Sequence, residues 1–197
     1  MRLFRMLFAA VGATMMFGAL VGIASARTIT YSESRLTARF ARVEFSGAGG
    51  TTRCNLTLSR VFHSRTISKV LESLVGLITE ASVGGCDPGT GSATILRETL
   101  PWHLRYNGFS GTLPNITAIQ YKVVGFAYRV REPGSLECLV TTTAGAPIIT
   151  RSGATSGVNT AEEVEGTFNC FFISSRVRGT TLTSGGSVSP VVTVTLI

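Results

Sequence analysis

Apolar and polar residues alternate along much of this chain with a period of two, which is typical of β-strands that bury one face. The clearest example is the segment 35–45, whose apolar positions fall into two sets that are out of phase. They are Leu36, Ala38 and Phe40, followed by Ala41, Val43 and Phe45. A bulge near residues 40–41 would keep both sets on the buried face of one strand and leave the arginines of the segment in solvent.

Similar strand-like segments follow, separated by Gly, Pro, Ser and Asn clusters that indicate turns. They cover residues 28–31, 54–59, 93–100, 102–109, 116–131, 136–143, 164–174 and 191–197. Within 116–131 the buried phase switches near residues 123–124, and Gly125 predicts a bulge or tight bend there. We predict an all-β, antiparallel fold of about eight to ten short strands, either a β-sandwich or a Greek-key barrel.

One segment carries a competing helical pattern. Its apolar residues recur at nearly helical spacing and are Ile67, Val70, Leu71, Leu74, Val75 and Ile78. The spacing predicts a short helix over residues 66–74. The alternative is a short turn followed by a strand from Val75 to Val83.

The first 26 residues have the three parts of a secretory signal peptide. Arg2 and Arg5 are followed by an apolar run that Gly and Ala dilute, and by the small residues Ala24, Ser25 and Ala26. An uncleaved membrane anchor is the alternative, and the cleavage site argues against it. We therefore expect residues 1–26 to be removed, and residues 27–197 to form a single secreted or extracytoplasmic domain, typical of small exported bacterial β-proteins.

All four cysteines lie in the part that would be exported, where the environment is oxidising and an even count predicts disulfides. We favour the pairs Cys54–Cys86 and Cys138–Cys170, each spanning 32 residues, among the three connectivities that are possible. No C-x-x-C motif occurs, and neither histidine stands near a cysteine at ligand spacing. The sequence therefore predicts two structural disulfides and gives no metal site and no cofactor.

The positive charge of the chain is concentrated near the start of the predicted domain. The formal net charge is +7, and residues 27–65 hold seven arginines against two glutamates. Arg35, Arg39 and Arg42 are candidate contacts for an anionic partner such as a wall polymer or a lipid headgroup; a solvated strand face is the alternative. We expect no nucleic acid as partner, because like-charge runs and arginines interleaved with aromatic residues are lacking.

The densest cluster of polar and aromatic residues is the segment 98–106. Its Trp102, His103, Arg105 and Tyr106 are candidate ligand-binding residues, because aromatic and arginine side chains stack on sugars and anchor interfaces. The alternative is a partly buried strand that carries the only tryptophan of the chain.

Residues suited to catalysis are few. The chain has one aspartate, Asp87, two histidines and no G-x-S-x-G motif. Glu98 with His103, or the glutamates at 162, 163 and 165, are the candidates for acid/base chemistry. The acidic segments also lack the pattern of a calcium loop, and we assign no catalytic residue.

These observations favour a secreted, non-catalytic β domain that binds a partner or forms part of an extracellular surface. The partner would be an anionic cell-envelope polymer or another extracellular protein, with no membrane span after cleavage. The first alternative is a cell-wall or polysaccharide hydrolase that uses Glu98 and His103. The second is a carrier of a small hydrophobic ligand, which requires a barrel with an unfilled centre.

Overall fold

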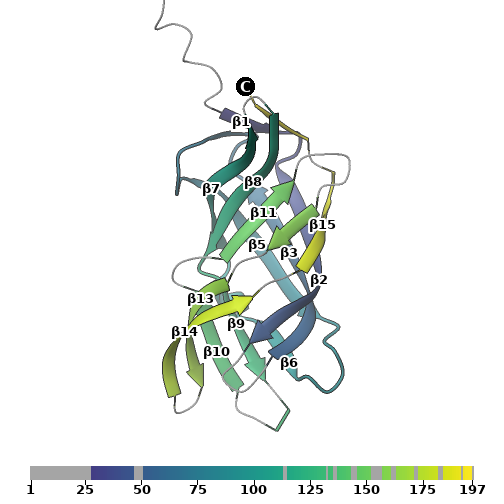
Figure 1. Cartoon of the computed structure of the whole chain (residues 1–197), viewed down its shortest axis with the longest axis vertical. Coiled ribbons are helices and arrows are strands. Elements are labelled where there is room, and N and C mark those ends of the chain that lie inside the picture. Colours follow the sequence, from purple (N-terminus) through teal and green to yellow (C-terminus); the bar gives the residue numbers. More distant parts are fainter. Residues whose placement is uncertain are drawn as a thin grey trace, which may run out of the picture.

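The structure, a computed structural model, consists almost entirely of antiparallel β-strands (Figure 1). It describes residues 28–46, 51–112, 115–131, 133–134, 137–142, 146–151, 157–160, 163–170, 173–181, 184–191 and 193–196. These contain sixteen strands and one 3-10 turn, η2 (Arg97–Thr99). The predicted antiparallel all-β fold is confirmed, whereas the predicted signal peptide, 1–26, lies outside the described residues.

Eight strands close into a barrel in which each strand pairs with two neighbours. In order around the barrel they are β11 (Ala146–Arg151), β12 (Gly157–Thr160), β15 (Ser184–Ser189), β2 (Arg35–Ser46), β3 (Thr51–Phe62), β5 (Leu74–Gly84), β7 (Trp102–Thr112) and β8 (Asn115–Val124). The pairing of β8 with β11 closes the ring, from Val123 opposite Ala146 to Ala118 opposite Arg151. Each of these eight strands is thus paired on both sides over at least part of its length.

A second, five-stranded sheet lies at one end of the barrel, the lower end in Figure 1. Its strands in order are β14 (Ile173–Thr181), β13 (Glu163–Cys170), β10 (Glu137–Thr142), β9 (Ala127–Arg131) and β6 (Ser92–Ile95). The chain alternates between the two sheets, since hairpin β9–β10 is in this sheet, β11–β12 in the barrel and β13–β14 in this sheet again. The two sheets are therefore interleaved along the sequence.

A small three-stranded sheet lies near the opposite end of the barrel, where Figure 1 labels β1. In it β1 (Thr28–Tyr31) stands between β16 (Val194–Leu196) and β4 (Thr66–Ser68). Ile29 is buried, with Leu196 opposite it on one side and Ile67 on the other. The first and last described strands are thus neighbours.

β2 contains the bulge that the phase change in its sequence predicts. Ala41 and Arg42 together face one residue of β3, Asn55, because the register shifts between Phe40 and Val43. Of the six apolar residues predicted to be buried here, five are buried: Leu36, Ala38, Phe40, Val43 and Phe45. Ala41 was wrongly assigned to this set: it is exposed because it is one of the two bulged residues.

The predicted helix over residues 66–74 is wrong. Its first residues form β4 instead, a turn follows, and β5 begins at Leu74. Within the turn the amide of Ser73 donates to the carbonyl of Val70 at 3.2 Å, and Glu72 has a φ of 60°, a left-handed conformation that ends a right-handed helix. Pairing of β4 with β1 outweighs the local helical spacing. The alternative, a strand over 75–83 after a turn, is confirmed.

Large side chains of the described strands are buried in the barrel, and the same core continues into the five-stranded sheet. The largest fully buried side chains of the described barrel strands are Leu36, Phe40, Phe45, Ile78, Trp102, Leu104, Tyr106 and Tyr121. Phe45 of β2 meets Tyr128 of β9 edge to face, with ring centroids 5.1 Å apart. One hydrophobic cluster therefore spans both sheets.

An arginine lies inside this apolar interior. Arg60 is 2% exposed, and its register neighbours on β2 and β5 are Leu36 and Ile78. Its guanidinium carbon lies 5.3 Å from the ring centroid of Phe62 and 5.8 Å from that of Tyr121, within cation–π range. Burial lowers the pKa of Arg60 to about 10, because the charged form is poorly solvated there.

The first predicted disulfide, Cys54–Cys86, is present. In the second predicted pair, Cys138 on β10 lies directly opposite Cys170 on β13 in the antiparallel register. No cysteine among the described residues is free. Because the side chain of Cys170 lies outside the described part, the Cys138–Cys170 bond stays a prediction.

Candidate functional site

The outer surface of β15, β2, β3 and β5 carries small hydroxyl side chains together with arginines. It arises from strict alternation: in β2, for example, Leu36 and Ala38 point into the barrel, so that Arg35, Thr37 and Arg39 point outward. We call this surface the hydroxyl–arginine face. It consists of Arg35, Thr37, Arg39, Thr57, Ser59, Thr79, Glu80, Ser82, Ser187 and Ser189, with Arg97 of η2 at its edge.

The pairing register arranges these side chains in two rows that cross four strands. One row runs Ser189, Thr37, Ser59, Glu80, and the other runs Ser187, Arg39, Thr57, Ser82. Neighbouring strands lie about 4.8 Å apart, so each row offers a polar group at regular intervals across the sheet. The rows form an ordered polar surface on the rigid wall of the barrel.

Three depressions adjoin one another on this face. The largest, ≈ 740 Å³, is lined by side chains that include Arg39, Asn55 and Ser187. A second of ≈ 370 Å³ shares Thr57 with the first, and a third of ≈ 530 Å³ shares Ser59 with the second. The depressions are open to solvent, so the face fits an extended ligand better than a small molecule that must be enclosed.

The hydroxyl–arginine face is positively charged. Three arginines, at 35, 39 and 97, stand on it against one glutamate, Glu80. Within the described residues none of these four side chains forms an ion pair. The exposed guanidinium groups of Arg35 and Arg39 are therefore available to an anion, for which arginine offers a planar pair of N–H donors.

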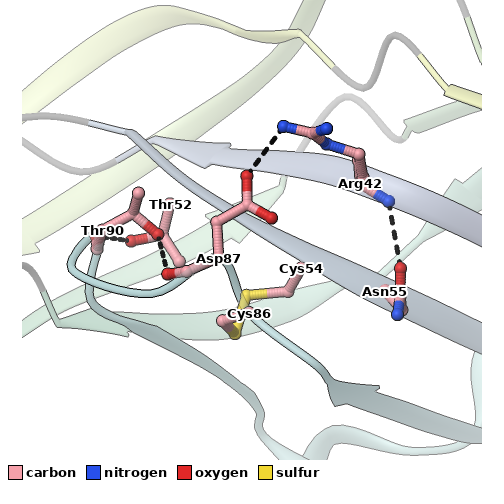
Figure 2. The surroundings of a disulfide bond; sticks show 7 residues. All are labelled: Arg42, Thr52, Cys54, Asn55, Cys86, Asp87 and Thr90. Carbon is pink, nitrogen blue, oxygen red and sulfur yellow. Dashed lines mark hydrogen bonds and ion pairs between the residues drawn. A yellow bond between two sulfur atoms is a disulfide. The ribbon is translucent and has the colours of Figure 1, made fainter.

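The third predicted anion contact, Arg42, is engaged elsewhere (Figure 2). It stands in the bulge with a φ of 56°, and its backbone amide donates to Oδ1 of Asn55 at 3.2 Å. Its guanidinium Nη2 donates to Oδ2 of Asp87 at 2.9 Å. The structure thus places Arg35 and Arg39 on one face and directs Arg42 toward the loop after β5.

That loop is held to β3 by further contacts besides the disulfide, and Figure 2 shows the one between Thr52 and Thr90 near the two sulfur atoms. The amide of Asp87 donates to the carbonyl of Arg53 at 2.8 Å, and Thr90 Oγ1 donates to the carbonyl of Asp87 at 2.7 Å. Thr52, which is buried, donates its hydroxyl to the carbonyl of Thr90. Asp87 is therefore paired with Arg42 and helps to hold this loop in place.

The four candidate ligand-binding residues of the segment 98–106 do not share one surface. Trp102 and Tyr106 are buried in the barrel, where Trp102 Nε1 donates to Thr99 Oγ1 at 2.8 Å. His103 and Arg105 point outward, and Arg105 lies 3.9 Å from a carboxylate oxygen of Glu72. The segment's two aromatic anchors thus belong to the core, and a ligand on its outer side would meet only His103 and Arg105.

The candidate acid/base residues do not form a visible catalytic pair. Glu98 in η2 and His103 in β7 are both exposed, and no hydrogen bond or ion pair joins them in the described part of the chain. Residue 162 is outside the described residues, and the side chains at 163 and 165 are not described. No group of three or more potential metal ligands occurs among the residues that the structure describes.

Sequence reasoning missed most of the hydroxyl–arginine face. Its signal was present as the alternation of Asn55, Thr57 and Ser59 with leucines, but alternation alone does not say which strands lie side by side. Ser187 and Ser189 reach the face only because β15 pairs with β2, a contact between distant parts of the sequence.

Comparisons of the chain with protein-family models, curated proteins and solved structures give no match. Among the described residues, no helix has the length and apolar character needed to cross a membrane.

Proposed function

We propose that this protein is a non-catalytic, exported binding domain whose hydroxyl–arginine face holds an acidic polysaccharide of the cell envelope. The observation that carries the proposal is the continuity of the face: two polar rows and three adjoining depressions, with Arg35 and Arg39 exposed in them. A long, shallow polar surface suits a chain of sugars, whose hydroxyl groups exchange hydrogen bonds with serine and threonine. Carboxylates on the same chain suit the arginines.

Three further features support this function over the alternatives. The large side chains inside the barrel leave the carrier hypothesis with little support, because a carrier needs an apolar cavity for its ligand. The hydrolase hypothesis needs two titratable groups that converge on a substrate, and Glu98 and His103 make no mutual contact. The predicted signal peptide and the Cys54–Cys86 disulfide suit a protein that works outside the cytosol.

Binding to polygalacturonate, with neutral dextran as the comparison polymer, tests the proposal. The protein is produced from the full chain in an oxidising compartment, and its affinity is measured as a function of salt. We expect binding to polygalacturonate that weakens as salt is raised, because the arginine contacts are exposed and screened. Dextran should bind at least tenfold more weakly.

The matched variants are Arg35→Ala/Arg39→Ala and Arg65→Ala/Arg131→Ala, which remove the same charge from different surfaces. Arg65 and Arg131 are exposed and lie outside the hydroxyl–arginine face. The first pair should lower the affinity for polygalacturonate at least tenfold, and the second should change it less than twofold. Equal losses in both, or no binding at low salt, would refute the assignment of this face.

A further inference from the structure

A short turn between β4 and β5 exposes apolar side chains to a degree found at few other places in the described residues. Val70, Leu71 and Leu74 are exposed by 61%, 65% and 49%, and Val191 is the one other large hydrophobic side chain of comparable exposure in that part. The three lie within five consecutive residues. Isolated apolar residues on a surface need no explanation, but a cluster at the tip of a turn does.

The turn is held rigidly, so the exposure is built into the fold. The amide of Glu72 donates to the carbonyl of Tyr106 at 2.8 Å, and the amide of Tyr106 donates to the carbonyl of Ser73 at 2.9 Å. These bonds fix the turn to β7, and the left-handed conformation of Glu72 directs the chain back toward β5. Val70 and Leu71 are thereby presented without the entropy loss that ordering a flexible loop would bring.

Basic side chains surround the apolar tip. Lys69 Nζ lies 5.8 Å from the ring centroid of Phe109. Lys122 Nζ lies 2.7 Å from Oε1 of Glu72, and Arg105 Nη1 lies 3.9 Å from Oε2 of the same carboxylate. Two cations, Lys122 and Arg105, thus lie at the carboxylate of Glu72, and Lys69 adds a third positive charge to the turn, so the surroundings of the tip carry a net positive charge. We call residues 69–74 with Arg105 and Lys122 the basic apolar turn.

We propose that the basic apolar turn docks on an anionic lipid surface, with Val70, Leu71 and Leu74 entering the boundary between headgroups and acyl chains. Apolar residues flanked by lysine and arginine are the combination that binds such interfaces, because the long cationic side chains reach the headgroups while the apolar ones leave water. Each basic residue near the surface strengthens the attraction to anionic lipid. A protein partner is less well matched, since a five-residue tip is small compared with a stable protein interface.

Sedimentation with lipid vesicles tests this inference. The protein from the full chain is mixed with vesicles of phosphatidylcholine alone or of phosphatidylcholine with 30% phosphatidylglycerol, a composition chosen so that about a third of the lipid is anionic. We expect at least tenfold stronger binding to the anionic vesicles. Leu71→Asp should reduce that binding at least tenfold, and Val191→Asp, the matched change at another exposed apolar residue, should leave it within twofold.

A second variant reports insertion directly. Leu71→Trp places a fluorophore at the tip, and its emission should shift to the blue on anionic vesicles; the natural Trp102 is buried and should not respond. Absence of vesicle binding at low salt, equal losses in the two aspartate variants, or self-association that depends on Leu71 without vesicle binding would each overturn the proposal. Leu71→Asp should still bind polygalacturonate, and Arg35→Ala/Arg39→Ala should still bind vesicles, so failure of one proposal is distinguishable from failure of the other.

Discussion

Arg42 and Asp87 form an ion pair of 2.9 Å that joins the bulge of β2 to the loop that follows β5. Asp87 stands next to Cys86, so the same loop is tied to β3 by a disulfide and to β2 by this ion pair. Both partners keep contact with water, the arginine side chain being 65% exposed. An ion pair so exposed contributes less than about 1 kcal/mol to stability, and its main effect is to position the loop.

The backbone of Arg42 matters more than its charge for the stability of the bulge. Its φ of 56° is unfavourable for a residue with a Cβ atom and normal for glycine. We predict that Arg42→Gly is more stable than Arg42→Ala by about 1 kcal/mol, although both variants lose the ion pair. Urea unfolding with the disulfide intact measures the difference. An Arg42→Ala protein as stable as Arg42→Gly would show that the bulge relaxes to another conformation.

The Cys54–Cys86 disulfide should contribute substantially to stability because it closes a loop with a sequence separation of 32 residues. On the chain-entropy model a loop of this length corresponds to about 3–4 kcal/mol. We therefore expect Cys54→Ala/Cys86→Ala to lower the free energy of unfolding by about that amount, measured in guanidinium chloride. The wild type under reducing conditions is the control and should be no more stable than the double variant, because reductant would also break the predicted Cys138–Cys170 bond. A loss below about 1 kcal/mol would contradict the model.

The features that sequence could predict are those that depend on near neighbours in the chain. The phase change in residues 35–45 located the bulge, and the switch near Gly125 marks the bend, with a φ of 88°, at which the chain leaves barrel strand β8 for β9 of the second sheet. Likewise, Cys54 on β3 and Cys86 just after β5 come together through the antiparallel pairing of β3 with β5, two strands that are close in the sequence.

The features that could not be predicted depend on partners distant in sequence. Segment 66–74 has helical spacing, but β4 forms because β1 lies beside it. The hydroxyl–arginine face depends on the pairing of β15 with β2. The inward direction of Trp102 and Tyr106, by contrast, follows from local alternation, since both share the phase of Leu104 on β7.

Gly76 on β5 marks a place where two strands approach closely. A Cβ atom added there would overlap the carbonyl oxygen of Val61 and lie 3.0 Å from Cα of Phe62, and both obstacles are backbone. We predict that Gly76→Ala destabilises the protein by about 2 kcal/mol or more, because neither backbone can move without disturbing the barrel. Gly84→Ala on the same strand is the control, since nothing lies within 4 Å of its added Cβ. Thermal unfolding compares the two, and similar midpoints would mean that β3 and β5 separate easily at residue 76.

The buried hydroxyl of Tyr31 should destabilise the folded protein, and replacing Tyr31 by phenylalanine removes this hydroxyl. The side chain is 1% exposed and stacks on Phe62 at 4.6 Å between centroids, but its hydroxyl has no hydrogen-bond partner in the described part of the protein. A buried polar group without a partner costs about 1–3 kcal/mol. We therefore predict that Tyr31→Phe raises the free energy of unfolding by about 1 kcal/mol at neutral pH.

The same variant gives a pH dependence with a definite sign. Burial raises the pKa of Tyr31 well above its ordinary value of 10.0, an effect that the charge of Arg60 only partly offsets. Above pH 10 the unfolded chain releases this proton and the folded protein keeps it, so Tyr31 lowers stability as the pH rises beyond 10. Burial also raises the pKa of Tyr106, while the lowered pKa of Arg60 acts in the opposite direction above pH 10. Those contributions are shared by the wild type and Tyr31→Phe to first order and largely cancel in their difference.

The stability advantage of Tyr31→Phe over the wild type should therefore be constant from pH 7 to about 9. It should widen above pH 10, because Tyr31 of the unfolded chain ionises there while Tyr31 of the folded protein stays protonated. Urea unfolding at each pH measures this difference, and tyrosine absorbance in the folded protein checks its cause: the wild type should show no more ionised phenol than the variant until it unfolds. A constant advantage across pH 10 would place the Tyr31 hydroxyl in contact with water, and a narrowing one would mean that Arg60 stabilises its ionised form more than burial opposes it.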